Sequence, residues 1–198
     1  MKILLLSDLH SSQSTLKGLD TLLGSERFDL VLSPGDITDR HDGHPLEYLD
    51  QFINLVTQKH HLPLKMVYGN NDSKEVIEHA RQAGVLLHFD DEKIEGYRIA
   101  GIGDVESQPE IPGGSLNNLT GAIAVSHRPT PQFKELKASG TPLANAPMIQ
   151  IFGHLHTRAE TNQLGQTLVI NVPAGALGRY AVLDLPSKMV QFKWFKDS

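Results

Sequence analysis

Met1-Lys-Ile-Leu-Leu-Leu-Ser-Asp-Leu-His10 opens the chain, and the reading of all later residues starts from it. Residues 3–6 form a short apolar run, which is typical of a strand buried on both faces. Asp8 and His10 follow at alternating positions, so in an extended chain both side chains point to the same side. A carboxylate and an imidazole at the tip of a buried strand are a common beginning of a metal site.

The composition is that of an ordinary globular protein. With 198 residues, 39% hydrophobic and 21% charged, the chain is long enough for one sizeable core, and we expect a single domain over residues 1–198. The absence of cysteine excludes disulfides and thiolate metal sites. We expect no membrane span, because no run of about 18 apolar residues exists. The first apolar run is also too short for a signal peptide, so a cytoplasmic location fits best.

The charge limits the class of partner. A formal net charge of −5 argues against binding along a nucleic-acid polymer, which needs a basic stripe. A single phosphate group at a metal centre remains compatible, since bound cations would dominate the local field.

The first 84 residues alternate between short apolar runs and amphipathic stretches. We predict strands at 3–6, 28–32 and 64–68, each followed by a helix; the third helix begins at Asp72, which with Glu75 resembles a capping box. Units of about 30 residues are typical of right-handed βαβ crossovers. Later segments are shorter: strands at 85–89, 93–95 and 97–102 favour antiparallel pairing, further strands are expected at 122–125, 148–152, 168–172, 180–185 and 190–195, and a short helix within 130–140.

Five predicted strands end in side chains that can bind metal. They are Asp8 and His10, then Asp36, Asn70, His127, and finally His154 and His156. Ligands of open α/β sheets bind beyond the carboxyl ends of the strands. Glycine precedes three of these clusters, at positions 35, 69 and 153, where the backbone must turn closely. Taken singly, Asp36 can cap a turn, His127 can be a core histidine, and the last pair can be a solvated strand edge. Together they indicate a metal centre.

These motifs resemble those of the calcineurin-like metallophosphoesterases. In order they are Asp8-x-His10, Gly35-Asp36-x-x-Asp39, Gly69-Asn70-Asn71-Asp72, Ser126-His127 and Gly153-His154-x-His156. The likeness spans residues 8–156 and is greatest to the small, single-domain bacterial and archaeal phosphodiesterases. It implies an α/β fold of four layers, α/β/β/α, with two mixed β-sheets.

The resemblance also implies two metal ions that share one aspartate. The first would be held by Asp8, His10, Asp36 and His156, and the second by Asp36, Asn70, His127 and His154. Imidazole mixed with carboxylate suits Mn²⁺, Fe, Zn²⁺, Ni²⁺ or Co²⁺ better than Mg²⁺ or Ca²⁺, and we favour Mn²⁺. Two such ions about 3.5–4 Å apart activate a bridging water, so the hypothesis is in-line attack of a hydroxide on phosphorus.

One residue departs from the family pattern. Asn71 stands where the family commonly has a histidine associated with protonating the leaving group, and an amide is no general acid at neutral pH. Because positioned proton transfer is worth about 10²–10⁴-fold, we expect diesters and activated aryl esters to be better substrates than alkyl monoesters. His41 is a candidate replacement donor, with a solvated loop as the alternative. Arg128 is a candidate phosphate contact, or else part of a surface salt bridge.

The function that this pattern favours is a dinuclear-metal phosphoesterase, with a small phosphodiester as its substrate. The alternatives are a metal-binding or scaffold protein of the same fold, as in the retromer subunit of this superfamily, and a nuclease. All seven ligand positions hold competent residues, which favours the enzyme. The loops 40–45 and 104–120 would determine which substrate binds. The sequence identifies no protein partner.

Overall fold

The first half of the chain folds as three strand–helix units. The computed structural model describes residues 1–104, 106, 118–129 and 145–195. Three short strands pair in parallel: β1 (Lys2–Leu5), β2 (Leu30–Ser33) and β3 (Leu64–Met66). A helix follows each of them: α1 (Gln13–Ser25), α2 (Pro45–Asn54), which continues as the π-helix Leu55–Lys59, and α3 (Lys74–Gln82). The alternation predicted from the 30-residue spacing is confirmed.

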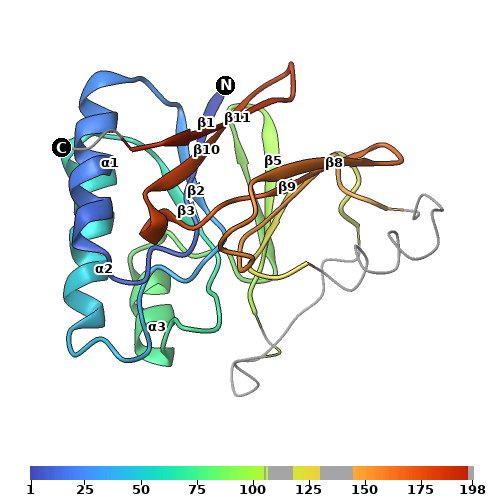
Figure 1. Cartoon of the computed structure of the whole chain (residues 1–198). Coiled ribbons are helices and arrows are strands. Elements are labelled where there is room, and N and C mark those ends of the chain that lie inside the picture. Colours follow the sequence, from blue (N-terminus) through green and yellow to red (C-terminus); the bar gives the residue numbers. More distant parts are fainter. Residues whose placement is uncertain (105, 107–117, 130–144, 196–198) are drawn as a thin grey trace.

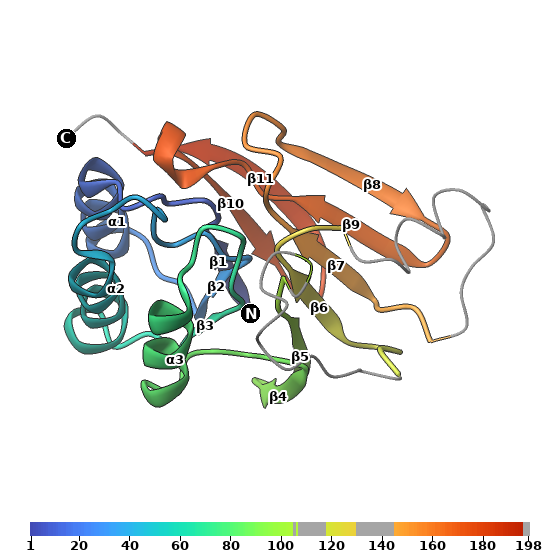
Figure 2. The same ribbon diagram turned by 90° about the horizontal axis from the view of Figure 1, so that it is seen from below.

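Two C-terminal strands complete the first sheet. They are β10 (Arg179–Asp184) and β11 (Met189–Trp194), and both are antiparallel to their neighbours, which gives the order β11-β10-β1-β2-β3. The three α-helices lie on one face of this sheet (Figures 1 and 2). Their apolar stripes face the sheet, and Leu19, Leu49 and Phe52 are fully buried there in one cluster with Leu4 and Leu6 of the chain start. None of the helices among the described residues has the length and apolar character needed to cross a membrane.

The second sheet has six strands in the order β4-β5-β6-β7-β9-β8. They are β4 (Asp90–Ile94), β5 (Tyr97–Ile102), β6 (Ile123–Ser126), β7 (Ile149–Phe152), β8 (Glu160–Leu164) and β9 (Thr167–Asn171). The four central strands are parallel, and the two edge strands are antiparallel to their neighbours. The antiparallel hairpin predicted within 93–102 is therefore confirmed.

The two sheets pack face to face, and their inner faces form one core. Ile3 and Leu32 of the first sheet meet Val125 and Ile151 of the second, and all four side chains are fully buried. This arrangement confirms the prediction of an α/β fold with two mixed sheets. The short helix predicted within 130–140 lies outside the described residues.

Two local predictions are wrong. Residues 85–89 do not form an antiparallel strand. Leu86 forms an isolated parallel bridge with Met66, and Leu87 N–H donates to the Met66 carbonyl, so this part of the segment runs beside β3. Asp72 does not cap α3. The cap is Ser73, whose Oγ accepts from Val76 N–H, because the Asp72 carboxylate is engaged elsewhere.

Candidate metal centre

The seven predicted ligand positions meet where the carboxyl ends of the parallel strands come together. Two of them follow β1, one follows each of β2, β3 and β6, and two follow β7. Backbone hydrogen bonds join these strand ends: Asp8 N–H donates to the Gly35 carbonyl at 3.0 Å, and Gly153 N–H donates to the His127 carbonyl at 3.1 Å. The strand-end rule applied to the sequence therefore identified segments that do lie side by side.

The backbone of this region is unusual at four of the seven positions. The φ angles of Asp8, His10, Asp36 and His154 are 54°, 46°, 53° and 65°, in the left-handed region that non-glycine residues seldom adopt. Each such residue costs on the order of 1–3 kcal/mol, and surrounding contacts must hold it in place. For Asp36 these contacts include its carbonyl, which accepts from Leu9 N–H at 2.8 Å and from His10 N–H at 3.2 Å.

Two of the glycines before the ligands allow a close approach of backbone to side chain. A Cβ at Gly69 would overlap Asp36 Oδ1, and a Cβ at Gly153 would overlap Ser7 Oγ. The prediction that these glycines stand at close backbone turns is confirmed, since any side chain here would push the ligand carboxylates out of position.

One group of ligand-type atoms surrounds the end of β1. Asp8, His10, Asp36 and His156 each offer one atom, and these atoms all lie within 4.8 Å of one another. His156 Nε2 lies 3.0 Å from Asp8 Oδ1 and 3.3 Å from His10 Nε2. Two imidazoles and two carboxylates that face one another in this way can hold a divalent cation.

A second group is centred on His127. Its Nε2 lies 3.1 Å from Asn70 Oδ1, 3.2 Å from His154 Nδ1 and 3.4 Å from Asp36 Oδ2. The other ring nitrogen, Nδ1, lies 3.1 Å from the Pro34 carbonyl, which can only accept a hydrogen bond. We therefore place the proton on Nδ1, which leaves the Nε2 lone pair facing the site.

The Asp36 carboxylate lies between the two groups. Its Oδ2 is 3.9 Å from His10 Nε2 in the first group and 3.4 Å from His127 Nε2 in the second. Asn71 holds the same carboxylate from the protein side: its backbone N–H donates to Oδ1 at 2.8 Å and its Nδ2 to Oδ2 at 2.7 Å. The residue that replaces the usual histidine thus binds Asp36.

The electrostatics of the site fit a cation. The side chains of Asp8 and Asp36 are fully buried, and no described residue donates a hydrogen bond to Asp8 Oδ1. A buried carboxylate oxygen without a donor is costly, and a cation beside it offsets that cost. Burial lowers the pKa of His154, and the neighbouring His127 and Arg128 lower it further, while Asp8 and Asp36 raise it; the net shift favours the neutral imidazole, which can bind a metal.

Two arginines contact Asn70 at the edge of the site. Arg128 Nη2 donates to Asn70 Oδ1 at 3.2 Å, while its Nε donates to the buried carboxylate of Asp104 at 2.9 Å. Arg40 Nη2 donates to the Asn70 carbonyl at 2.7 Å. Arg128 is therefore ion-paired, but the pair lies inside the site region. Asp104 was missed in the sequence, although it follows β5 just as the ligands follow their own strands.

Sequence reasoning gave Asp72 the role of a helix cap, but it serves the site instead. Its carboxylate is fully buried and accepts from the N–H groups of Asp36, Thr38 and Gly69. Burial raises the pKa of this carboxyl to about 6; the Asp36 carboxylate also raises it, whereas the N–H groups of Gly69 and Thr38 lower it. Its position inside the ligand motif, two residues after Asn70, was the available signal.

His41 lies exposed in a turn in which its N–H donates to Asp39 Oδ1 at 2.9 Å. This is the position that the solvated-loop alternative describes. A proton-donor role for His41 stays a prediction, as do the roles of Arg128 and of the individual ligands.

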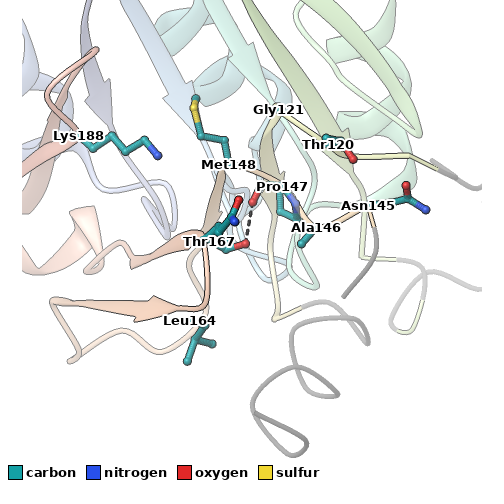
Figure 3. Close-up of a pocket in the computed structure, with 10 residues that line it drawn as sticks. Thr120, Gly121, Asn145, Ala146, Pro147, Met148, Leu164, Thr167 and Lys188 are labelled. Atoms are coloured by element: carbon teal, nitrogen blue, oxygen red, sulfur yellow. Dashed lines mark hydrogen bonds between the residues drawn. The ribbon is translucent and has the colours of Figure 1, made fainter. Parts of the chain in front are cut away.

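A cleft of about 560 Å³ lies elsewhere, before the amino ends of β6 and β7 (Figure 3). Its lining residues are Thr120, Gly121, Asn145, Ala146, Pro147, Met148, Leu164, Gln166, Thr167 and Lys188. Thr167 Oγ1 donates to the Pro147 carbonyl at 2.7 Å, which joins the β8–β9 hairpin to the segment before β7. Because none of the seven predicted ligands lines it, this cleft is separate from the candidate metal centre.

Comparison with known proteins agrees with this geometry. Residues 1–188 match the family model of the calcineurin-like phosphoesterase superfamily domain. No curated protein sequence matches the chain with significance. Among solved structures, TT1561 of Thermus thermophilus is similar with a TM-score of 0.67 and 15% identity, covering 98% of this chain and 99% of that one.

Two further structures are similar over nearly their full length. A novel archaeal phosphodiesterase has a TM-score of 0.62 and 18% identity, covering 98% of this chain and 99% of its own. YfcE, a phosphoesterase from E. coli, has a TM-score of 0.54 and 16% identity, covering 99% of this chain and 100% of its own. At these identities the structural likeness establishes the fold.

Proposed function

Because this chain belongs to the calcineurin-like phosphoesterase superfamily, we propose that it is a metal-dependent phosphoric ester hydrolase that favours phosphodiesters. The observation that carries the proposal is the place of Asp36, whose carboxylate lies between two groups of ligand-type side chains. A scaffold would need neither group, and a nuclease would need a basic surface that a net charge of −5 does not favour.

Asp8, His10, Asp36 and His156 would hold one divalent cation, and Asp36, Asn70, His127 and His154 a second. The mixed nitrogen and oxygen donors favour a transition metal, and we favour Mn²⁺. Bound cations would lower the pKa of a coordinated water and would neutralise charge on the phosphate. The chain's own part is to fix the donors, through the Nδ1 hydrogen bond of His127 to the Pro34 carbonyl and the bonds of Asn71 to Asp36.

Asn71 limits which esters the site can hydrolyse well, and alkyl monoesters should be the poorest substrates. Its amide donates to Asp36 and has no proton to give to a leaving alkoxide at neutral pH. Esters whose leaving groups depart without protonation are therefore the better substrates, unless His41 supplies the proton. The archaeal phosphodiesterase among the similar structures supports the choice of diesters as substrates.

Arg128 would contact the phosphate of the substrate. Its guanidinium is held by Asp104 and lies against Asn70, next to the second group of ligands. A guanidinium fixed at the edge of an anion site binds phosphate oxygens through charge-assisted hydrogen bonds.

The test is hydrolysis of bis-(p-nitrophenyl) phosphate and p-nitrophenyl phosphate by purified, chelator-treated protein, with and without added Mn²⁺. We expect activity that depends on Mn²⁺, is higher on the diester, and is lost in Asp36→Asn. The matched control is Asp90→Asn, which alters an exposed aspartate at the start of β4. Metal binding without hydrolysis of either ester would contradict the enzyme and leave the scaffold alternative.

A further inference from the structure

One buried carboxylate joins two of the loops that carry the candidate ligands. Asp72 Oδ2 accepts from Asp36 N–H at 2.9 Å and from Gly69 N–H at 3.0 Å. Asp72 Oδ1 accepts from Thr38 N–H at 3.0 Å and from Thr38 Oγ1 at 3.1 Å. The loop after β2 and the loop after β3 are thus fixed to the same side chain.

These hydrogen bonds hold the backbone at two positions of unusual geometry, Asp36 and Gly69. Asp36 has a φ of 53°, which the chain does not adopt without support, and Asp72 binds the N–H of that very residue. Gly69 precedes Asn70 and packs directly against Asp36 Oδ1. The hydrogen bond from its N–H to Asp72 therefore also fixes the position of the Asn70 backbone.

The bonds extend to the loop after β1. The Asp36 carbonyl accepts from Leu9 N–H and His10 N–H, so the peptide groups on both sides of Asp36 are held. Its carboxylate is held in turn by Asn71, the residue next to Asp72. Any movement of the Asp72 carboxylate would therefore shift ligands of both groups.

Asparagine cannot replace this carboxylate without loss. Both oxygens face donors, so an amide in either orientation turns its own N–H atoms toward a backbone N–H. The smallest loss occurs when the amide nitrogen takes the Oδ1 position, because the Thr38 hydroxyl can rotate to accept while Thr38 N–H is left unpaired.

We infer that Asp72 is a positioning residue, which holds Asp36 and Asn70 in the geometry that binds the cations without touching a cation itself. This inference rests on the proposed function, since it assumes that Asp36 and Asn70 are metal ligands. Replacing a residue that holds a metal ligand by hydrogen bonds, without binding the metal itself, typically changes the metal affinity by about 10–100-fold.

The experiment measures Mn²⁺ binding to the chelator-treated chain by calorimetry, together with thermal unfolding of the same samples. We expect Asp72→Asn to be folded at the temperature of the titration and to bind Mn²⁺ about 10–100-fold more weakly than the unaltered chain. The Mn²⁺ concentration for half-maximal hydrolysis should rise by the same factor. The matched control is Asp90→Asn, which removes another carboxylate that accepts a backbone N–H, that of His88 at 2.7 Å, and should bind Mn²⁺ normally.

Folded Asp72→Asn that binds Mn²⁺ as the unaltered chain does would overturn the positioning role and leave the proposed function intact. An unaltered chain that binds no Mn²⁺ would overturn both. If Asp72→Asn does not fold, Thr38→Val decides, because it removes only the hydroxyl donor to Oδ1. It should weaken Mn²⁺ binding in the same direction, and an unchanged affinity in this variant would equally refute the inference.

Discussion

Replacing Asn71 with histidine changes two properties of the site at once. The imidazole can protonate a leaving alkoxide near neutral pH, which an amide cannot do. The same change removes the 2.7 Å bond from Asn71 Nδ2 to Asp36 Oδ2, while the 2.8 Å bond from the backbone N–H to Oδ1 remains. The two effects fall on different measurable quantities.

The lost hydrogen bond affects metal binding. A bond to a charged group contributes about 1.5–3 kcal/mol, or about 10–150-fold in affinity. Because Asn71 is only half-buried, we take the lower end and expect the half-saturating Mn²⁺ concentration to rise about tenfold. At saturating Mn²⁺, the added acid should increase turnover of an alkyl diester by about 10²-fold or more. Turnover of bis-(p-nitrophenyl) phosphate, whose leaving group needs no proton, should change little.

The assay is initial rate against Mn²⁺ concentration for both diesters. Asn71→Ala is the control that removes the hydrogen bond without adding an acid, and His41→Ala, measured beside it, shows whether that histidine donates the proton. Equal rates for Asn71→His, His41→Ala and the unaltered chain on both esters would refute the argument that proton donation limits hydrolysis. Unchanged half-saturation in Asn71→Ala would refute the role given to the Asn71 hydrogen bond.

Arg128→Met should raise KM for the diester about tenfold and alter kcat less if, as we propose, the guanidinium beside Asn70 binds the phosphate; an unchanged KM would exclude it from the substrate site. In the metal-free protein, an NMR titration of His154 should give a midpoint below its ordinary pKa of 6.5, and a midpoint above it would contradict the burial argument. As the pH falls, the unfolded chain binds this proton at a higher pH than the folded chain does. The contribution of neutral His154 to the free energy of unfolding is therefore complete above pH 6.5 and is lost as the pH falls from 6.5 through the lowered pKa of the folded chain. Gly69→Ala should lower the free energy of unfolding by about 1–3 kcal/mol in denaturant titrations, since its Cβ would overlap Asp36, whereas Gly24→Ala, with open space at that position, should not.

The fold was predictable where the pattern is local. The apolar runs before Asp8, Asp36 and Asn70 are separated by amphipathic stretches, and both features need only the nearest residues to be recognised. The strand-end rule then identified which side chains meet, because parallel strands place their carboxyl ends at one edge.

What could not be predicted depends on contacts between distant loops. Asp72 and Glu75 match a capping box, yet the carboxylate is taken by N–H groups of a loop 34 to 36 residues earlier, and Ser73 caps the helix in its place. The bond between Asn71 and Asp36 is of the same kind. The segment that begins at Val85 was predicted to pair antiparallel, whereas Leu86 forms a parallel bridge with Met66, because pairing partners are a long-range property that apolar content does not encode.

Anomalous diffraction from crystals of the chain grown with Mn²⁺ is the most direct test that two ions share one carboxylate. Two peaks should appear about 3.5–4 Å apart, with Asp36 bonded to both, Asp8, His10 and His156 at one, and Asn70, His127 and His154 at the other. A single peak, or two peaks of which one lies away from Asp36, would contradict the dinuclear centre.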